Sequence, residues 1–184
     1  TVKILFVLGY IASALAMFIL VDSLIGSWPA FVSSILYTYV PYKAVEVYVR
    51  GAMSEFWALT FFPLILWAIY KLIKTENLPA GRQGRKYFIW FSIFLALLLT
   101  THNLMSLIFA PVAIVWAIYW LIIEKKIKIW SKLFLSGLLG VGLAAFFTLP
   151  VLFEKKFAHV DSVLSGYFDY RAHFVSLYKI FISR

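Results

Sequence analysis

The sequence predicts an all-α fold: a polytopic bundle of about six transmembrane helices, with an interfacial helix and a C-terminal outer segment. Of the 184 residues, 64% are hydrophobic and 14% are charged. A soluble domain is about half apolar and about a quarter charged. The apolar residues form runs close to the roughly 20 residues that cross a bilayer core about 30 Å thick. Basic residues cluster between these runs.

The predicted spans lie near 4–21, 29–42, 56–73, 87–100, 104–123 and 133–153. The run 29–42 is short and contains several hydroxyl residues, so it spans only if it is tilted or lined by neighbouring helices. Pro63 interrupts the third span, where a neighbouring helix can satisfy the carbonyl that proline leaves without a donor.

A break and a strip of small residues define the later spans. The apolar stretch 87–123 is too long for one helix, and Thr100-Thr101-His102-Asn103 divides it into two spans that form a tight hairpin. The last span contains Ser136, Gly137, Gly140, Gly142 and Ala144. Small residues at such spacing suit close helix packing in lipid.

Three segments between or after the spans are too polar to cross a membrane. The tyrosine-rich stretch 41–50 is predicted to be an interfacial helix. Residues 74–86 contain the turn-forming sequence Asn77–Gly84 and are expected to be a connector. Residues 154–184 mix aromatic and charged side chains, which predicts an extracytoplasmic segment on the membrane surface.

The net charge of +9 (17 basic and 8 acidic residues) is interpreted as a topology signal, because of where the basic residues lie, and nucleic acid is not expected as a partner. Loops 22–28, 71–86 and 124–132 carry none, five and four Lys and Arg residues, and the opposite ends of the spans carry five. The positive-inside rule then predicts a multi-pass protein of the plasma membrane with both ends of the chain outside. If Arg171, Lys179 and Arg184 are counted as well, the outer side carries eight basic residues, and its difference from the inner side nearly disappears.

The first of three polar clusters contains Tyr48, Arg50 and Glu55. Charges at a membrane boundary can simply anchor a helix. The functional alternative is that the planar fork of Arg50 holds a phosphate, while Glu55 orients Arg50 or accepts a proton.

The second cluster, Thr101, His102 and Asn103, lies in the hairpin turn. Thr and Asn are ordinary turn residues that satisfy backbone groups. A histidine is not required there, and ionisable residues at membrane depth are functional candidates. His102 is therefore a candidate for binding phosphate or transferring a proton.

The third cluster, Glu154, Lys155 and Lys156, follows the last span and is explained by side chains that extend to the interface. His159, Asp161, Asp169 and His173 lack the spacing of a tight metal-ligand motif. We expect no metal site and no cofactor. The sequence has no cysteine, which excludes disulfides and thiolate chemistry.

Several short motifs resemble a known family. They are Leu36–Tyr42, Tyr48–Ala52 with Glu55, His102-Asn103, Thr148-Leu149-Pro150 with Glu154, and Gly166–Arg171. Together they resemble the large bacterial and archaeal membrane proteins called 6-pyruvoyl-tetrahydropterin synthase-related, whose layout is similar to that of multi-spanning GT-C glycosyltransferases. The resemblance covers about residues 4–184.

The resemblance implies a protein that handles polyprenyl-phosphate-linked sugars at the outer membrane face. Candidate contacts to the carrier phosphate are then Tyr48, Arg50, Glu55, His102, Asn103 and Glu154. In GT-C enzymes the catalytic acid usually lies in a large outer loop after the first span. No such loop is seen here, so we expect this chain to be a fragment that lacks the acid, and its catalytic residues are unknown.

Two other classes stay open. A transporter or flippase for lipids or lipid-linked sugars would use the same basic and aromatic outer face, although no internal repeat is visible. A non-catalytic assembly subunit would use the strip of small residues to pack against partner helices.

Overall fold

A computed structural model describes residues 2–75 and 82–154 of the chain. In these two ranges the elements are all helical, as the sequence predicts. They are α1 (Val2–Ile25), α2 (Ser27–Thr38), α3 (Pro41–Ala44), the π-helix η1 (Val45–Arg50), α4 (Met53–Thr75), α5 (Arg82–Thr101), α6 (Asn103–Ile123), the 3-10 turn η2 (Ile127–Ile129), α7 (Trp130–Leu143) and α8 (Ala145–Glu154). The predicted outer segment beyond Glu154, with its Lys, His and Asp residues, lies outside the described residues, as does most of the connector around 76–81.

Three of the described helices, α1, α4 and α6, are long and apolar enough to cross a membrane. A fourth crossing is added if residues 127–143 and 145–154 count as one broken span. These helices are compatible with a membrane-embedded protein. The prediction of about six spans is thus met only in part.

The missing spans have local causes. Helix α2 has 12 residues, a length of about 18 Å, which is well short of a bilayer core. It ends early because Pro41 holds Val40 in an extended conformation (φ −54°, ψ 126°) and starts α3. Helix α5 begins with basic residues, so its apolar part is shorter than a full span. The predicted span 133–153 is divided at Ala144 into α7 and α8, and α8 belongs to a second compact unit that begins at residue 146.

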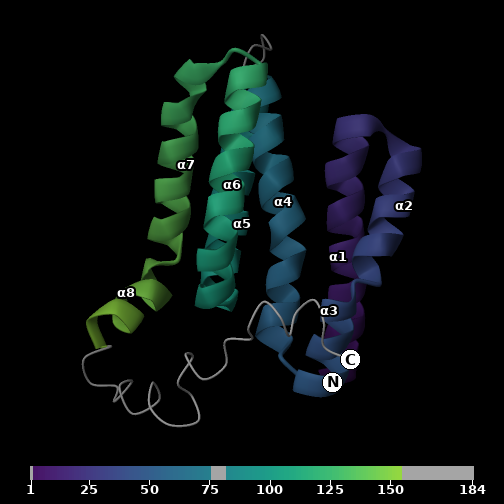
Figure 1. The fold of residues 1–184 in the computed structure, drawn as a ribbon. Coiled ribbons are helices and arrows are strands. Elements are labelled where there is room, and N and C mark those ends of the chain that lie inside the picture. Colours follow the sequence, from purple (N-terminus) through teal and green to yellow (C-terminus); the bar gives the residue numbers. More distant parts are fainter. Residues whose placement is uncertain (1, 76–81, 155–184) are drawn as a thin grey trace, which may run out of the picture. The chain divides into compact units, whose positions relative to one another are not determined.

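Helix α4 is the centre of the first compact unit, residues 1–145. Figure 1 shows α4 between the α1–α2 pair and the group formed by α5, α6 and α7. Of its most apolar stretch 56% is buried, against 22% in α1 and 17% in α6. Its buried side chains Ile65, Ile69 and Leu72 form the core with Leu98 of α5 and Phe109 of α6.

Part of the predicted strip of small residues packs within the chain. On α7, Ser136 is buried and its hydroxyl lies 2.9 Å from that of Ser92 on α5. A Cβ atom at Gly140 would lie 2.9 Å from the carbonyl oxygen of Ser92, so only glycine allows this approach. A Cβ at Gly142 would meet nothing within 4 Å. The best-packed part of the strip therefore joins α7 to α5 and is not available to a partner.

Pro63 is accommodated inside α4 as the sequence predicts. Because proline has no N–H, the carbonyl of Leu59, one turn earlier, loses its helical donor. The hydroxyl of Tyr37 on α2 donates to this carbonyl at 2.7 Å. A side chain from a neighbouring helix thus replaces the missing backbone bond.

We expect this compensation to appear in a double-mutant cycle. Tyr37→Phe removes the donor and should destabilise the protein by about 1 kcal/mol. In a Pro63→Ala background the same change should cost much less, because an alanine at this position supplies its own N–H to Leu59. Thermal unfolding in detergent measures both, with Tyr39→Phe at an exposed position as the control. An equal cost in the two backgrounds would contradict the assignment.

Candidate functional site

Arg50 lies at the centre of a polar cluster at the N-terminal end of α4. Its Nη1 donates to Glu46 Oε1 and to Glu55 Oε2, both at 2.6 Å, and its Nη2 donates to Glu55 Oε1 at 2.9 Å. Both carboxylate oxygens of Glu55 therefore accept hydrogen bonds from Arg50, in the bidentate geometry that makes arginine–carboxylate contacts specific. Glu46 is fully buried, Glu55 is 12% exposed and Arg50 is 47% exposed.

The local backbone brings these three side chains together. Glu46 and Arg50 are four residues apart in the π-helix η1, and wide helical turns of this kind are frequent at functional sites. Gly51 ends η1 in the left-handed conformation (φ 61°), which a residue with a side chain rarely adopts. The chain reverses there, so Glu55 in the first turn of α4 meets Arg50.

His102 joins the cluster from the turn between α5 and α6. Its Nδ1 accepts the backbone N–H of Met105 at 3.1 Å and so caps the N-terminus of α6. In the neutral ring this bond assigns the proton to Nε2, since Nδ1 acts as the acceptor. Nε2 lies 3.5 Å from Glu55 Oε1. The helix cap thus orients the ring with its donor toward the carboxylate.

Glu55 is the shared acceptor of the cluster, because Tyr42 also donates its hydroxyl to Oε2 at 3.0 Å. The hydrogen bond to Glu55 and the charges of Glu46 and Glu55 raise the pKa of Arg50 above its usual value, so the guanidinium stays charged. The two carboxylates and one guanidinium sum to a charge of −1. Glu46 Oε2 is buried and has no hydrogen-bond partner among the described residues.

Of the predicted site residues, the structure brings Arg50, Glu55 and His102 together. Tyr48 is 81% exposed, and Asn103 is exposed beside His102. Thr101 donates to the carbonyl of Leu97 within its own helix. Glu154 is exposed at the end of α8, in the second compact unit.

Sequence reasoning missed Glu46, Tyr42 and Lys43. All three lie in the stretch 41–50, for which the sequence predicts an interfacial helix. That stretch is helical, but it buries the side chains of Lys43 and Glu46. The spacing of Glu46 and Arg50, four residues apart on a helix, was the available signal for an ion pair.

Lys43 forms a second buried polar contact beside the cluster. Its Nζ donates to Ser13 Oγ of α1 at 2.7 Å and lies 3.9 Å above the ring of Tyr37. The side chain is 1% exposed, and this burial lowers the pKa of the ammonium to about 8. The aromatic face offsets part of the cost of burying the charge.

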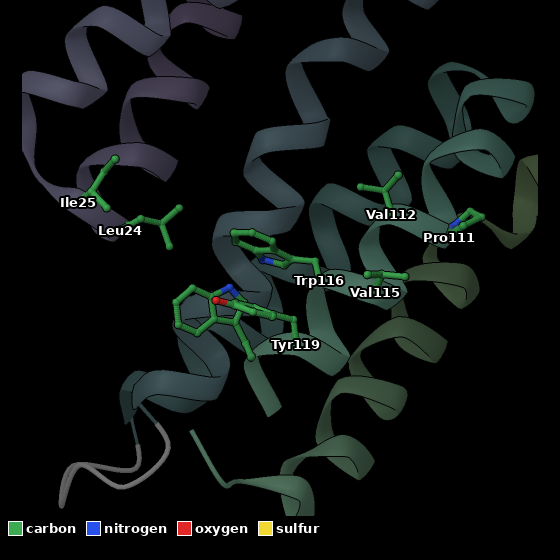
Figure 2. A pocket seen from close by; sticks show the side chains of 8 residues that line it. Leu24, Ile25, Pro111, Val112, Val115, Trp116 and Tyr119 are labelled. Atoms are coloured by element: carbon green, nitrogen blue, oxygen red, sulfur yellow. The ribbon is translucent and has the colours of Figure 1, made fainter. Parts of the chain in front are cut away.

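Two kinds of cavity are relevant here, and only the first borders the cluster. One of about 590 Å³ lies at the start of α4, between Gly51, Ser54, Trp57, Phe61 and Thr101, among others. The other is an apolar groove between α1 and α6, made of cavities of about 790 and 320 Å³ that share Val112. Figure 2 shows Leu24 and Ile25 facing Trp116 and Tyr119 across the larger of these. The smaller reaches Tyr37, whose ring lies under Lys43.

Comparisons with family models, curated proteins and solved structures give no match for this chain. Within the described ranges, no group of three or more His, Cys, Asp or Glu side chains is arranged to hold a metal ion.

The lowered pKa of Lys43 makes a prediction about stability and pH. Between about pH 8 and the ordinary lysine value of about 10.4, the folded protein has released a proton that the unfolded chain still binds. The contribution of Lys43 to the free energy of unfolding therefore rises with pH between these two values. Below about pH 8 the folded protein bears the full cost of burying the charged ammonium. We expect Lys43→Met to be more stable than the native chain at pH 7, by about 1–3 kcal/mol, with the difference shrinking toward pH 10.

Thermal unfolding of both proteins across this pH range measures the difference, in which titrations common to both cancel. Lys3→Met, at an exposed position, is the matched control and should show no such trend. If the difference in free energy of unfolding between the native chain and Lys43→Met stays constant with pH, Lys43 is not a buried charge.

Proposed function

We propose that this chain binds the phosphate of a lipid-linked sugar, as the carrier-binding part of a GT-C-like membrane glycosyltransferase. The observation that carries the proposal is the edge of the Arg50 guanidinium to which no hydrogen bond is made from the described residues. Arginine has five N–H donors. Three take part in the bonds to Glu46 and Glu55. The remaining two, on Nε and Nη2, are adjacent and form a fork that matches two oxygens of one phosphate.

The carboxylates make Arg50 a preorganised donor. Glu46 and Glu55 fix the guanidinium from two sides, while the side chain remains 47% exposed. A phosphate that binds the free fork therefore meets a donor pair that needs no reordering. The same carboxylates repel it, because the three side chains sum to −1. Removing the charge of Glu46 should thus improve phosphate binding, and this distinguishes a phosphate site from a simple ion-pair anchor.

The cavities supply places for the rest of such a substrate. The cavity of about 590 Å³ starts at the residue after Arg50 and offers the rings of Trp57 and Phe61 with the hydroxyls of Ser54 and Thr101. Its volume is in the range of small-molecule sites, and this mixed lining suits a sugar headgroup. The apolar groove between α1 and α6 suits a hydrocarbon chain.

Glu55 and His102 are the groups suited to proton handling in this proposal. His102 directs its Nε2 toward the carboxylate from 3.5 Å, and the helix cap keeps the ring in that orientation. A carboxylate and an imidazole at this spacing can pass a proton when an acceptor hydroxyl approaches.

One observation favours the alternative of a transporter. Glu46 is a buried carboxylate, and no described residue hydrogen-bonds its Oε2; a group of this kind binds the coupling proton in transporters. Such a protein would depend on the charge of Glu46, whereas the phosphate-binding proposal expects the opposite. Nothing comparable favours an assembly subunit, since Ser136 and Gly140 pack against α5.

The test is binding of polyprenyl phosphate to the protein in uncharged nanodiscs. We expect Arg50→Gln to weaken binding by about tenfold or more, equal to about 1.4 kcal/mol, and Glu46→Gln to tighten it several-fold. Tyr39→Phe, at an exposed position outside the cluster, should change nothing. The corresponding polyprenol, which lacks the phosphate, should not distinguish Arg50→Gln from the native chain.

Because Arg50→Gln leaves the charges of two carboxylates unpaired, thermal unfolding checks that this variant still folds. Glu46→Gln tests the proposal independently in the same binding assay. Loss of binding in Glu46→Gln would favour the transporter. Equal binding of phosphate and alcohol by all variants would remove the phosphate site altogether.

A further inference from the structure

A lysine-rich cavity lies at the other end of α6, where that helix turns into α7. Its volume is about 680 Å³. Four lysines and three isoleucines line it: Lys125, Lys126, Lys128, Lys132, Ile122, Ile127 and Ile129. None of these residues belongs to the Arg50 cluster or to the cavities described above.

The cavity is held in place by the C-terminal end of α4. The Nζ of Lys126 donates to the carbonyl oxygens of Ile73 and Lys74, at 2.9 and 3.0 Å, and so caps the last turn of α4. Lys125 adopts a left-handed backbone conformation (φ 53°), which is uncommon for a residue with a side chain. Ile129 is buried against the core. These contacts fix the loop, so the cavity does not depend on a ligand to form.

The charge of the lining selects an anion. Residues 124–132 contain four lysines and one acidic residue, Glu124, which gives a local charge of 4 − 1 = +3. Lys125 and Lys128 are exposed, and Lys126 is engaged with α4. Two lysine side chains are thus accessible to an anionic group at the cavity.

The isoleucines decide which anion fits best. Ile122 and Ile127 are 62% and 65% exposed, at the end of a helix apolar enough to cross a membrane. Free phosphate and nucleic acid have no hydrocarbon to place against them. An anionic phospholipid carries a phosphate and acyl chains in one molecule, and basic pockets between helices at a membrane surface bind such headgroups.

We propose that this cavity binds the headgroup of an anionic phospholipid, with Lys125 and Lys128 on the phosphate and Ile122 and Ile127 against the start of the acyl chains. Helix α6 has 21 residues between the His102 cap and this end, a rise of about 30 Å. That length equals the thickness of a bilayer core. The two phosphate sites would then lie at opposite membrane surfaces, with the carrier lipid at one and a structural lipid at the other.

The experiment compares the protein in nanodiscs of phosphatidylcholine alone and of phosphatidylcholine with added phosphatidylglycerol. Thermal unfolding and lipid retention in native mass spectrometry are the readouts. We expect phosphatidylglycerol to raise the unfolding temperature of the native chain and to be retained. Lys125→Gln/Lys128→Gln should weaken its retention by about tenfold or more.

Arg85→Gln/Lys86→Gln is the matched control, because it removes the same charge from exposed positions outside the cavity. It should keep the native response. If both double variants lose phosphatidylglycerol retention equally, the effect comes from net charge alone, and the proposed site is wrong. Equal stabilisation by dissolved inorganic phosphate would overturn the lipid as its ligand, and so would a native chain indifferent to phosphatidylglycerol. Polyprenyl phosphate binding at Arg50 is measured separately, so either proposal can fail alone.

Discussion

Hydrogen bonds from neighbouring side chains to the carbonyl oxygens of α4 are the interactions on which the first compact unit depends. Tyr37 of α2 donates to Leu59, Trp116 of α6 donates to Leu66 at 3.0 Å, and Lys126 donates to the last turn. The carbonyl of Leu59, opposite Pro63, and those of the last turn lack a helical donor, and in hydrocarbon such a carbonyl costs several kcal/mol. These contacts bring donors from both sides onto α4, whose apolar side chains form the core and which is the most buried of the three candidate spanning helices.

The same requirement shapes the polar end of the bundle. A buried carboxylate is tolerated only with a partner, and Glu46 obtains one from Arg50. Arg50 in turn is positioned by Glu55, and Glu55 also accepts from Tyr42. Each charged side chain of the cluster is thus held in position by a hydrogen bond to another one. Among residues 2–75 and 82–154, one edge of the Arg50 guanidinium has no hydrogen-bond partner, and that edge is what the proposed phosphate would occupy.

Much of the helical fold could be predicted from the sequence, because apolar runs and breakers act locally. The turn at His102 follows from its polar neighbours, and the accommodation of Pro63 was predicted, although Tyr37 was not identified as the donor. Only three or four of the six predicted spans are found among the described residues, because composition does not show that Val40-Pro41 would end α2 or that α7 would end before Ala145. Arg50 and Glu55 were identified by their charge at a span end. Glu46 and Lys43 were missed because a charged residue in an apparently interfacial helix is expected to face water, and their burial is set by packing against α1 and α4.

The most direct test of the account is photocrosslinking of a polyprenyl phosphate that carries a diazirine beside its phosphate, with the modified peptides identified by mass spectrometry. The account predicts crosslinks at the start of α4 and at the α5–α6 turn, around Ser54 and Thr101, with competition by unlabelled polyprenyl phosphate. Crosslinks confined to residues 122–132, or spread along the lipid-exposed faces without competition, would contradict a carrier-phosphate site at Arg50.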